Sequence, residues 1–254
     1  MKAMIFAAGL GTRFKPWTEK HPKALAPING KSLLERNIRY LQQFGITEVV
    51  LNVHHFADQI MEAIAKNEAW GSRIAISEEI GEVLETGGGL KKASWFFTDG
   101  PFVVMNADIL TDLDLNNMIA FHRQHTPLAT LAVTNRKSSR YFLFNEKNRL
   151  CGWRNIKTGE ERLVISGPGV PPVKSGDEPA QGSLPVLNEK AFSGIHIISP
   201  DLFSFLHREG KFSIVDVYLE LAGRKPILEF DHSGSKLVDV GKPEAVAVAE
   251  RMFI

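Results

Sequence analysis

The sequence has very little cysteine and no long hydrophobic run. Its 254 residues contain one cysteine, Cys151, which excludes an internal disulfide framework and a thiolate metal cluster. We expect Cys151 to pack as a small buried residue in a reducing compartment. No apolar run approaches the roughly 20 residues that cross a bilayer, and Arg13 follows the N-terminal apolar run too early for a signal peptide. These absences predict a soluble, cytoplasmic protein without a membrane partner.

An excess of charge of one sign is also missing. The 30 Lys and Arg residues nearly balance the 29 Asp and Glu residues, giving a formal net charge of +1. Without a broad basic field the chain is not expected to bind nucleic acid, and any anionic ligand must be bound by local charges. The length and a hydrophobic fraction of 44% suit one large α/β domain with a substantial core.

The first thirty residues contain the strongest local pattern. The apolar run at residues 3–8 predicts a short buried strand, which ends at Gly9-Leu10-Gly11-Thr12-Arg13. Glycines at the end of a strand allow a sharp turn and a close approach to a ligand. A bare turn flanked by two cations, Arg13 and Lys23, suits a polyphosphate. The turn is neither a Rossmann nor a Walker loop, because Phe14 stands where G-x-G-x-x-G needs glycine and G-x-x-x-x-G-K-[ST] is absent.

Strands and helices alternate through the first half of the chain. We expect strands at 48–53, 74–76 and 101–105, a helix at 33–44 capped by Ser32, and helices at 58–67 and 90–96, with a long ordered loop at 14–31. This alternation predicts an α/β fold with a Rossmann-like mixed, mainly parallel sheet sandwiched by helices. Ligands bind at the carboxyl ends of such strands, where Gly9, Gly11, Asn52 and Asp108 fall.

The second half is less regular. Helices are expected at 115–125, 200–206, 214–222 and 243–251, strands at 128–134, 192–198 and 236–240, and a hairpin over 141–144 and 149–153. Residues 155–185 are rich in Gly, Pro, Ser and charge, which predicts a long exposed loop or flap.

Several motifs together resemble a known enzyme family. The run Ala7-Ala8-Gly9-Leu10-Gly11-Thr12-Arg13, followed by Pro16-Trp17-Thr18 and Pro22-Lys23-Ala24-Leu25, resembles the signature of sugar-1-phosphate nucleotidylyltransferases. Further similarities lie at residues 82–88, 106–108, 192–195 and 238–243, so the resemblance covers nearly the whole chain. Within this family the sequence is most similar to N-acetylmuramate-1-phosphate uridylyltransferases, and also to mannose-1-phosphate guanylyltransferase-like enzymes.

The resemblance implies a fold, a reaction and site residues. It implies one nucleotide-diphospho-sugar transferase domain over 1–254, with a nucleotide half at 1–125 and a sugar-phosphate half at 126–254. The reaction would join a nucleoside triphosphate and a sugar-1-phosphate, with Arg13, Lys23 and Asp108 as catalytic residues and Mg²⁺ on Asp108 and Asp239. The implied nucleotide site is Ala7, Ala8, Gly9, Leu10, Gly11, Thr12, Arg13, Lys23, Glu82, Thr86, Gly87, Gly88 and Asn106, and the implied sugar site is Ser193, Gly194 and Arg154.

Alternatives remain open for individual residues and for the substrates. Arg13, Lys23 and Arg154 could be solvated surface charges, Asp108 could cap the next element, and His54 with its neighbour His55 is interpreted as structural or substrate-lining. The triphosphate could be UTP, with N-acetylmuramate-1-phosphate, or GTP, with mannose- or heptose-1-phosphate. A hypothesis of another class is a non-catalytic regulatory protein that binds nucleotide sugars. The chain is expected to be a monomer or a small homo-oligomer.

Overall fold

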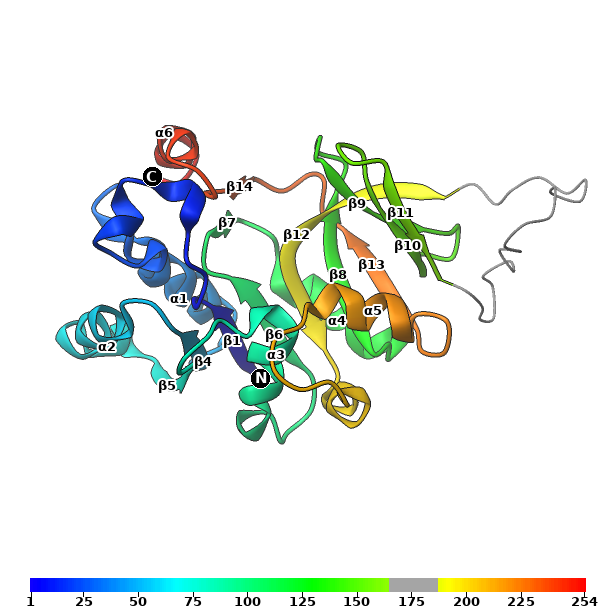
Figure 1. Ribbon diagram of the computed structural model, residues 1–254, viewed down its shortest axis with the longest axis horizontal. Helices are drawn as coiled ribbons and strands as arrows, with labels where there is room; N and C mark the ends of the chain where they lie inside the picture. Colours follow the sequence, from blue (N-terminus) through cyan, green and yellow to red (C-terminus); the bar gives the residue numbers. More distant parts are fainter. Residues whose placement is uncertain (165–186) are drawn as a thin grey trace, which may run out of the picture.

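The computed structural model describes residues 1–164 and 187–254. Within these residues a ten-stranded mixed sheet runs along the molecule (Figure 1), in the order β11-β10-β9-β12-β6-β1-β4-β5, with β8 beside β12 and β13 beside β8. These strands are β1 (Lys2–Phe6), β4 (Glu48–Val53), β5 (Arg73–Glu78), β6 (Phe102–Asn106), β8 (Ala129–Thr134), β9 (Arg140–Phe144), β10 (Leu150–Asn155), β11 (Glu160–Leu163), β12 (Asn188–Ile198) and β13 (Ile227–Asp231).

The strands of the first half form the parallel part of the sheet. β1 pairs in parallel with β4 on one side and β6 on the other, and β4 pairs in parallel with β5. β12 then pairs antiparallel with β6, β8 and β9, so the second half extends the sheet with mainly antiparallel strands. The predicted mixed, Rossmann-like sheet is confirmed, and the carboxyl ends of β1, β4 and β6 lie along one edge.

Helices cover both faces of the sheet. Alternate side chains of β1 point to opposite faces, as strand geometry requires. Ile5 packs in a core with α1 (Leu33–Gln43), α2 (Ala57–Lys66) and α4 (Leu115–His125). Met4 packs in a second core with α3 (Glu85–Lys92) and α5 (Ile214–Leu221). Helix α6 (Glu244–Met252) packs in a third, smaller core with Phe14 of the N-terminal loop. Val238 and Val240 belong to the same core.

The N-terminal loop is ordered by short elements. Residues 14–31 contain 3₁₀ turns at Trp17–Glu19 and Lys23–Leu25, and a third such turn, Thr12–Phe14, precedes them. The small hairpin of β2 (Pro27–Ile28) and β3 (Lys31–Ser32) then leads into α1. The predicted ordered loop is therefore confirmed. The Ser32 hydroxyl accepts a hydrogen bond of 3.0 Å from Glu35 N, which is the cap expected from the sequence.

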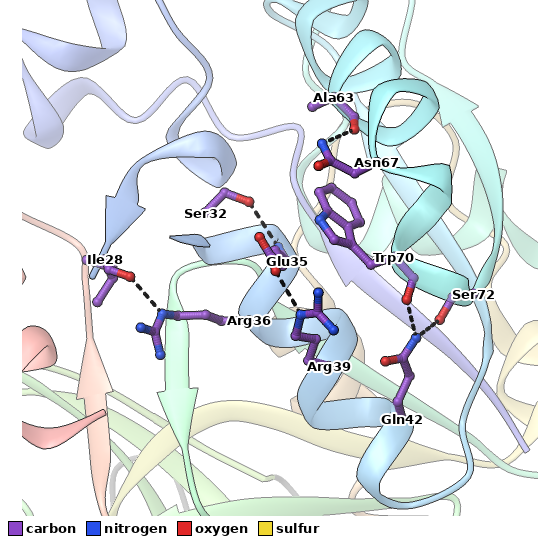
Figure 2. A network of polar contacts seen from close by, with 10 residues as sticks. All are labelled: Ile28, Ser32, Glu35, Arg36, Arg39, Gln42, Ala63, Asn67, Trp70 and Ser72. Atoms are coloured by element: carbon purple, nitrogen blue, oxygen red, sulfur yellow. Dashed lines mark hydrogen bonds and ion pairs between the residues drawn. The ribbon is translucent and has the colours of Figure 1, made fainter. Parts of the chain in front are cut away.

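Helix α1 contacts an unusual left-handed turn through the side chain of Gln42, which Figure 2 shows beside Trp70 and Ser72. Glu68, Ala69 and Trp70 have φ values of 49°, 51° and 51°. The Gln42 amide donates hydrogen bonds of 2.8 Å to the carbonyl oxygen of Trp70 and to the hydroxyl of Ser72. Left-handed backbone costs an L-residue free energy, so these bonds and the surrounding packing keep the chain in this conformation.

Four sequence expectations need correction. Helix α3 includes Gly87, Gly88 and Gly89 instead of starting after them, because the bare glycine face lets the helix approach neighbouring backbone. Strand β13 was not expected, and the segment at 200–206 forms a 3₁₀ helix, Pro200–Phe205. The expected loop at 155–185 begins inside β10 and includes β11, which pairs with β10; its residues from 165 onward lie outside the described residues.

Two further expectations can be compared with the structure. Cys151 is buried, with 3% of its surface exposed, and burial raises the pKa of its thiol. This agrees with the expected packing role. In the described part of the chain, no helix has both the length and the apolar composition to cross a membrane.

Candidate active site

The turn after β1 is open to solvent on one side and braced by protein on the other. Gly9 and Leu10 are exposed, and a Cβ built on Gly9 would meet nothing within 4 Å. Gly11 has φ +59°, and a Cβ there would lie 2.8 Å from Thr18 Cγ2 and 3.3 Å from Lys23 Cβ. The Thr18 hydroxyl donates a 2.9 Å hydrogen bond to Gly11 O. The loop thus folds back on the turn, and glycine is needed at position 11 for both conformation and space.

This fold-back places Lys23 beside the end of β6. Lys23 Nζ forms an ion pair with the Asp108 carboxylate, and the two side chains are 14% and 22% exposed. Trp17 Nε1 donates to Pro22 O at 3.2 Å, which fixes the chain directly before Lys23. Removing water from a lysine and an aspartate costs free energy. Loss of either side chain is therefore expected to leave the other charge buried and uncompensated.

A separate ladder brings Asp239 next to Asp108. Strand β14 (Leu237–Asp239) pairs antiparallel with β7 (Ile109–Thr111), and Asp239 stands opposite Ile109. Val240 N then donates a 2.8 Å hydrogen bond to Asp108 O. Two aspartates far apart in the sequence therefore lie at neighbouring strand ends, as expected from the pattern.

Asp239 lies among several charges. Desolvation of its carboxyl group by surrounding protein atoms raises its pKa, and the nearby Asp108 carboxylate raises it further. The positive charges of Lys23, Arg136 and Arg13 oppose this effect. A Cβ built on Gly241 would lie 2.7 Å from Asp239 Oδ1 and 3.3 Å from Arg13 Nη2, so Arg13 approaches Asp239 at this turn.

This carboxylate pair fits a hard divalent cation. Mg²⁺ is commonly held by one or two carboxylates together with phosphate oxygens and water, and it would offset the repulsion between two neighbouring carboxylates. Among the described residues no group of three or more His, Cys, Asp or Glu side chains is arranged to hold a metal. Asp108 and Asp239 would therefore need oxygen ligands from a substrate or from water. His54 Nδ1 lies 2.7 Å from Glu79 O, in keeping with a structural role.

The predicted sugar-site residues on β12 lie against the end of β6. Gly194 has φ +73°, and a Cβ there would lie 2.8 Å from the Asn106 side-chain nitrogen. Ser193 is buried, and its hydroxyl is 2.7 Å from His232 Nε2. Burial lowers the pKa of His232 to about 4; the Arg136 charge lowers it further, and the Asp231 and Asp112 carboxylates oppose this effect. The structure thus brings Asn106 and Gly194 together, and the Ser193 hydroxyl is occupied by its contact with His232.

Arg154 lies away from this group. On β10 it forms ion pairs with Glu161, at 2.5 Å, and with Glu189. Its charge is therefore compensated by carboxylates on β11 and β12, and sugar binding by Arg154 remains a prediction from the sequence resemblance.

The predicted base-binding segment is packed closely on its glycine face. A Cβ on Gly87 would lie 2.4 Å from the Phe212 ring, and one on Gly88 would lie 2.2 Å from Gly210 O. The Thr86 hydroxyl accepts a 3.0 Å hydrogen bond from Ile214 N. Helix packing thus already accounts for these glycines. Glu82 is exposed near the start of this segment, and base binding here remains a prediction.

Sequence reasoning missed two charged residues near these strand ends, Glu79 and Arg136. Glu79 is 1% exposed, accepts from the Asn52 amide at 2.7 Å and from Leu84 N at 2.8 Å, and so ties β4 to the start of α3. Asn52 in turn accepts a 2.9 Å hydrogen bond from Ala7 N, which fixes the end of β1. The second missed residue is Arg136. Neither residue belongs to a sequence motif, and the position of each is set by contacts with residues that are distant in the sequence.

Comparison with known proteins gives the family. The family model for nucleotidyl transferases matches residues 2–145. An N-acetylmuramate alpha-1-phosphate uridylyltransferase from Neisseria meningitidis is 43% identical over 45% of this chain and 49% of its own length. A UTP–glucose-1-phosphate uridylyltransferase from a Synechocystis strain is 39% identical over 52% of this chain and 36% of its own length. The matches to these two relatives therefore span half their length or less.

Other similarities extend over the whole chain. A mannose-1-phosphate guanyltransferase from Yarrowia lipolytica is 27% identical over 96% of this chain and 61% of its own length. The crystal structure of HddC from Yersinia pseudotuberculosis, complexed with GMP-PN, has a TM-score of 0.74 at 21% identity and covers 100% of this chain and 99% of that one. A UDP-glucose pyrophosphorylase complexed with UDP-glucose has a TM-score of 0.73 at 19% identity and covers 99% of this chain and 97% of that one. The fold is thus shared along the entire chain. With the family model matched over more than half of its residues, the chain belongs to the nucleotidyl transferase family.

Proposed function

We propose that the protein transfers a nucleotidyl group from a nucleoside triphosphate to a sugar-1-phosphate, releasing pyrophosphate and an NDP-sugar. The observation that supports this most is the meeting of Arg13, Lys23, Asp108 and Asp239 at one edge of the sheet. Three separate segments of the chain supply these four charges. The named activities of the relatives in the same family agree with the proposal.

The proposed reaction needs positioning and charge neutralisation more than proton transfer. A phosphate oxygen of the sugar-1-phosphate is already ionised; it attacks the α-phosphorus, and pyrophosphate leaves in line. The turn from Gly9 to Gly11 would bind the triphosphate, and Arg13 would neutralise the departing β- and γ-phosphates. Lys23 would stabilise charge at the reacting phosphorus, and this requires it to exchange its present contact with Asp108 for phosphate oxygens. Mg²⁺ held by Asp108 and Asp239 would supply further neutralisation of the phosphate oxygens.

Two substrate pairs are favoured by specific similarities. UTP with N-acetylmuramate-1-phosphate corresponds to the relative that is 43% identical, although that match spans only 45% of the chain. GTP with mannose-1-phosphate corresponds to the relative that is similar over 96% of the chain, and heptose-1-phosphate is a further acceptor to include. We favour the uridylyl pair, because the local identity is higher. Pyrophosphate release measured for the four common NTPs against N-acetylmuramate-, mannose-, heptose- and glucose-1-phosphate would identify the pair.

Substitution of the paired charges tests the reaction itself. Lys23→Ala and Asp108→Asn are each expected to lower pyrophosphate release by at least ~100-fold, because each removes one charge from the transition-state environment. The matched controls are Lys66→Ala and Asp201→Asn, which change exposed residues outside the site and are expected to keep wild-type rates. Circular dichroism checks that all four variants stay folded. Wild-type turnover in Lys23→Ala and Asp108→Asn would disprove the proposal. Tight nucleotide-sugar binding by a wild-type protein without turnover would instead favour the non-catalytic alternative.

A further inference from the structure

Arg136 is a cation held in place without a carboxylate partner. It follows β8 by two residues and is partly buried. One of its terminal nitrogens, Nη2, donates a 2.8 Å hydrogen bond to Phe192 O. Its Nε is buried and has no hydrogen-bond partner, and among the described residues no carboxylate lies within ion-pair distance of its guanidinium group. Because Nε is buried, an anion would bind at the terminal nitrogens, and a partly buried guanidinium without a carboxylate partner favours such binding.

The segment that holds Arg136 is fixed against the candidate active site. Phe192 precedes Ser193, whose hydroxyl contacts His232, and Gly194, whose backbone lies against the Asn106 side chain. Asn106 is the last residue of β6, two positions before Asp108. The hydrogen bond to Phe192 O therefore holds the Arg136 guanidinium against a segment of β12 that packs beside the end of β6.

The charge of Arg136 also acts on the site directly. Its positive charge acts on the Asp239 carboxylate, as do the charges of Lys23 and Arg13. Arg13 and Lys23 come from the N-terminal turn and its loop, whereas Arg136 comes from the segment after β8, in the second half of the chain. The site thus has cations from two separate parts of the fold. An in-line transfer between two phosphates needs positive charge near both the attacking and the leaving phosphate oxygens.

We propose that Arg136 binds the 1-phosphate of the acceptor sugar and holds its oxygen for attack on the α-phosphorus. This inference rests on the proposed function. A guanidinium group suits the role, because its planar donors can bind two phosphate oxygens at once and it stays charged at every working pH. Arg154, which the sequence resemblance suggested for the sugar site, is already paired with Glu161 and Glu189.

Binding and kinetic measurements on three variants test this role. In Arg136→Ala, the Kd and the KM for the sugar-1-phosphate are expected to rise by about 10- to 100-fold, as for loss of a charge-assisted hydrogen bond, while the KM for the NTP changes less than about threefold. Arg136→Gln keeps an N–H donor for Phe192 O but not the charge, and is expected to show the same loss with a wild-type thermal midpoint. Arg123→Ala, which changes an exposed arginine on α4, is the matched control and is expected to leave both constants unchanged.

The choice of probes separates the phosphate from other acidic groups. Titration calorimetry with Mg²⁺ would compare glucose-1-phosphate, mannose-1-phosphate and N-acetylmuramate-1-phosphate. An equal loss in Arg136→Gln for the sugar phosphates that wild type binds supports a contact with the phosphate. A loss of affinity confined to N-acetylmuramate-1-phosphate would assign Arg136 to the lactyl carboxylate and overturn the proposal. Unchanged binding of the sugar phosphates, or an equal loss of affinity for the NTP, would also overturn it. So would a wild-type protein that binds no sugar phosphate. Arg136-dependent binding without pyrophosphate release from any substrate pair would refute the proposed function and not this contact.

Discussion

Glu229 on β13 shows how one buried carboxyl group makes stability depend on pH. The residue is 6% exposed, and its Oε2 atom has no hydrogen-bond partner among the described groups. Burial raises the pKa of its carboxyl group to about 7, since the opposing charge of Lys190 only partly offsets the desolvation and Asp231 adds to it. The folded protein therefore resists ionisation of a group that ionises readily in the unfolded chain.

The expected consequence is a loss of stability on the alkaline side. Below pH 4.5 the group is neutral in both states and costs nothing, whereas above about pH 7 it is charged in the folded protein. Between these pH values, wild type should lose roughly 2–3 kcal/mol of unfolding free energy relative to Glu229→Gln. Urea denaturation at pH 5 and pH 8 measures this difference. The matched control is Glu146→Gln, at an exposed position, and a pH-independent difference between wild type and Glu229→Gln would contradict the expectation.

At the same scale, the sequence predicts some site residues and not others. Lys23 and Asp108 could be proposed because they belong to a long motif and follow predicted elements, and the structure pairs them. Arg136 and Glu79 could not be proposed, because their importance comes from contacts with Phe192, Asn52 and other distant segments. A charged residue after a strand is ordinarily a solvated one, and only tertiary neighbours distinguish it.

Among the elements, the left-handed turn at Glu68, Ala69 and Trp70 gives an unusual prediction. Ala69→Gly is expected to raise the unfolding free energy by about 0.5–1 kcal/mol, because glycine adopts φ +51° without the strain that alanine has there. The same change in the helix, Ala63→Gly, is the matched control and should lower the unfolding free energy by about 1 kcal/mol. Urea denaturation of both variants measures these shifts. A loss of equal size in both would show that the turn is not strained.

The elements also differ in how well the sequence determines them. Helix α1 was predicted almost to its ends, because its cap residue Ser32 and its periodic apolar residues act locally. The sequence predicts a start for helix α3 that is several residues too late, because three consecutive glycines are unfavourable in a helix. Here these glycines allow close contact with Phe212 and Gly210. Strand β13 was missed because only its pairing with β8 makes it a strand. Close tertiary packing thus overrode the local preference.

For the whole molecule, the sheet predicts a gradient of stability from its centre to its outer strands. β1 is paired on both sides and its residues Ala3, Met4 and Ile5 are fully buried. Among the described residues β11 pairs with β10 alone, and Glu160 and Glu161 on it are exposed. We expect the amides of β11 to exchange hydrogen at least ~100-fold faster than those of β1. Hydrogen–deuterium exchange read by mass spectrometry measures this, and equal protection would mean that the sheet opens as one unit.

The short ladder between β7 and β14 sets a condition on when the proposed enzyme can first work. β7 is made with the first half of the described chain, whereas β14 and its Asp239 emerge from the ribosome only after β13 and α5. A growing chain can form β1, β6 and the contact between Lys23 and Asp108 as each segment appears. It still lacks the second carboxylate. The proposed nucleotide transfer is therefore expected only after β14 has been made and has paired with β7.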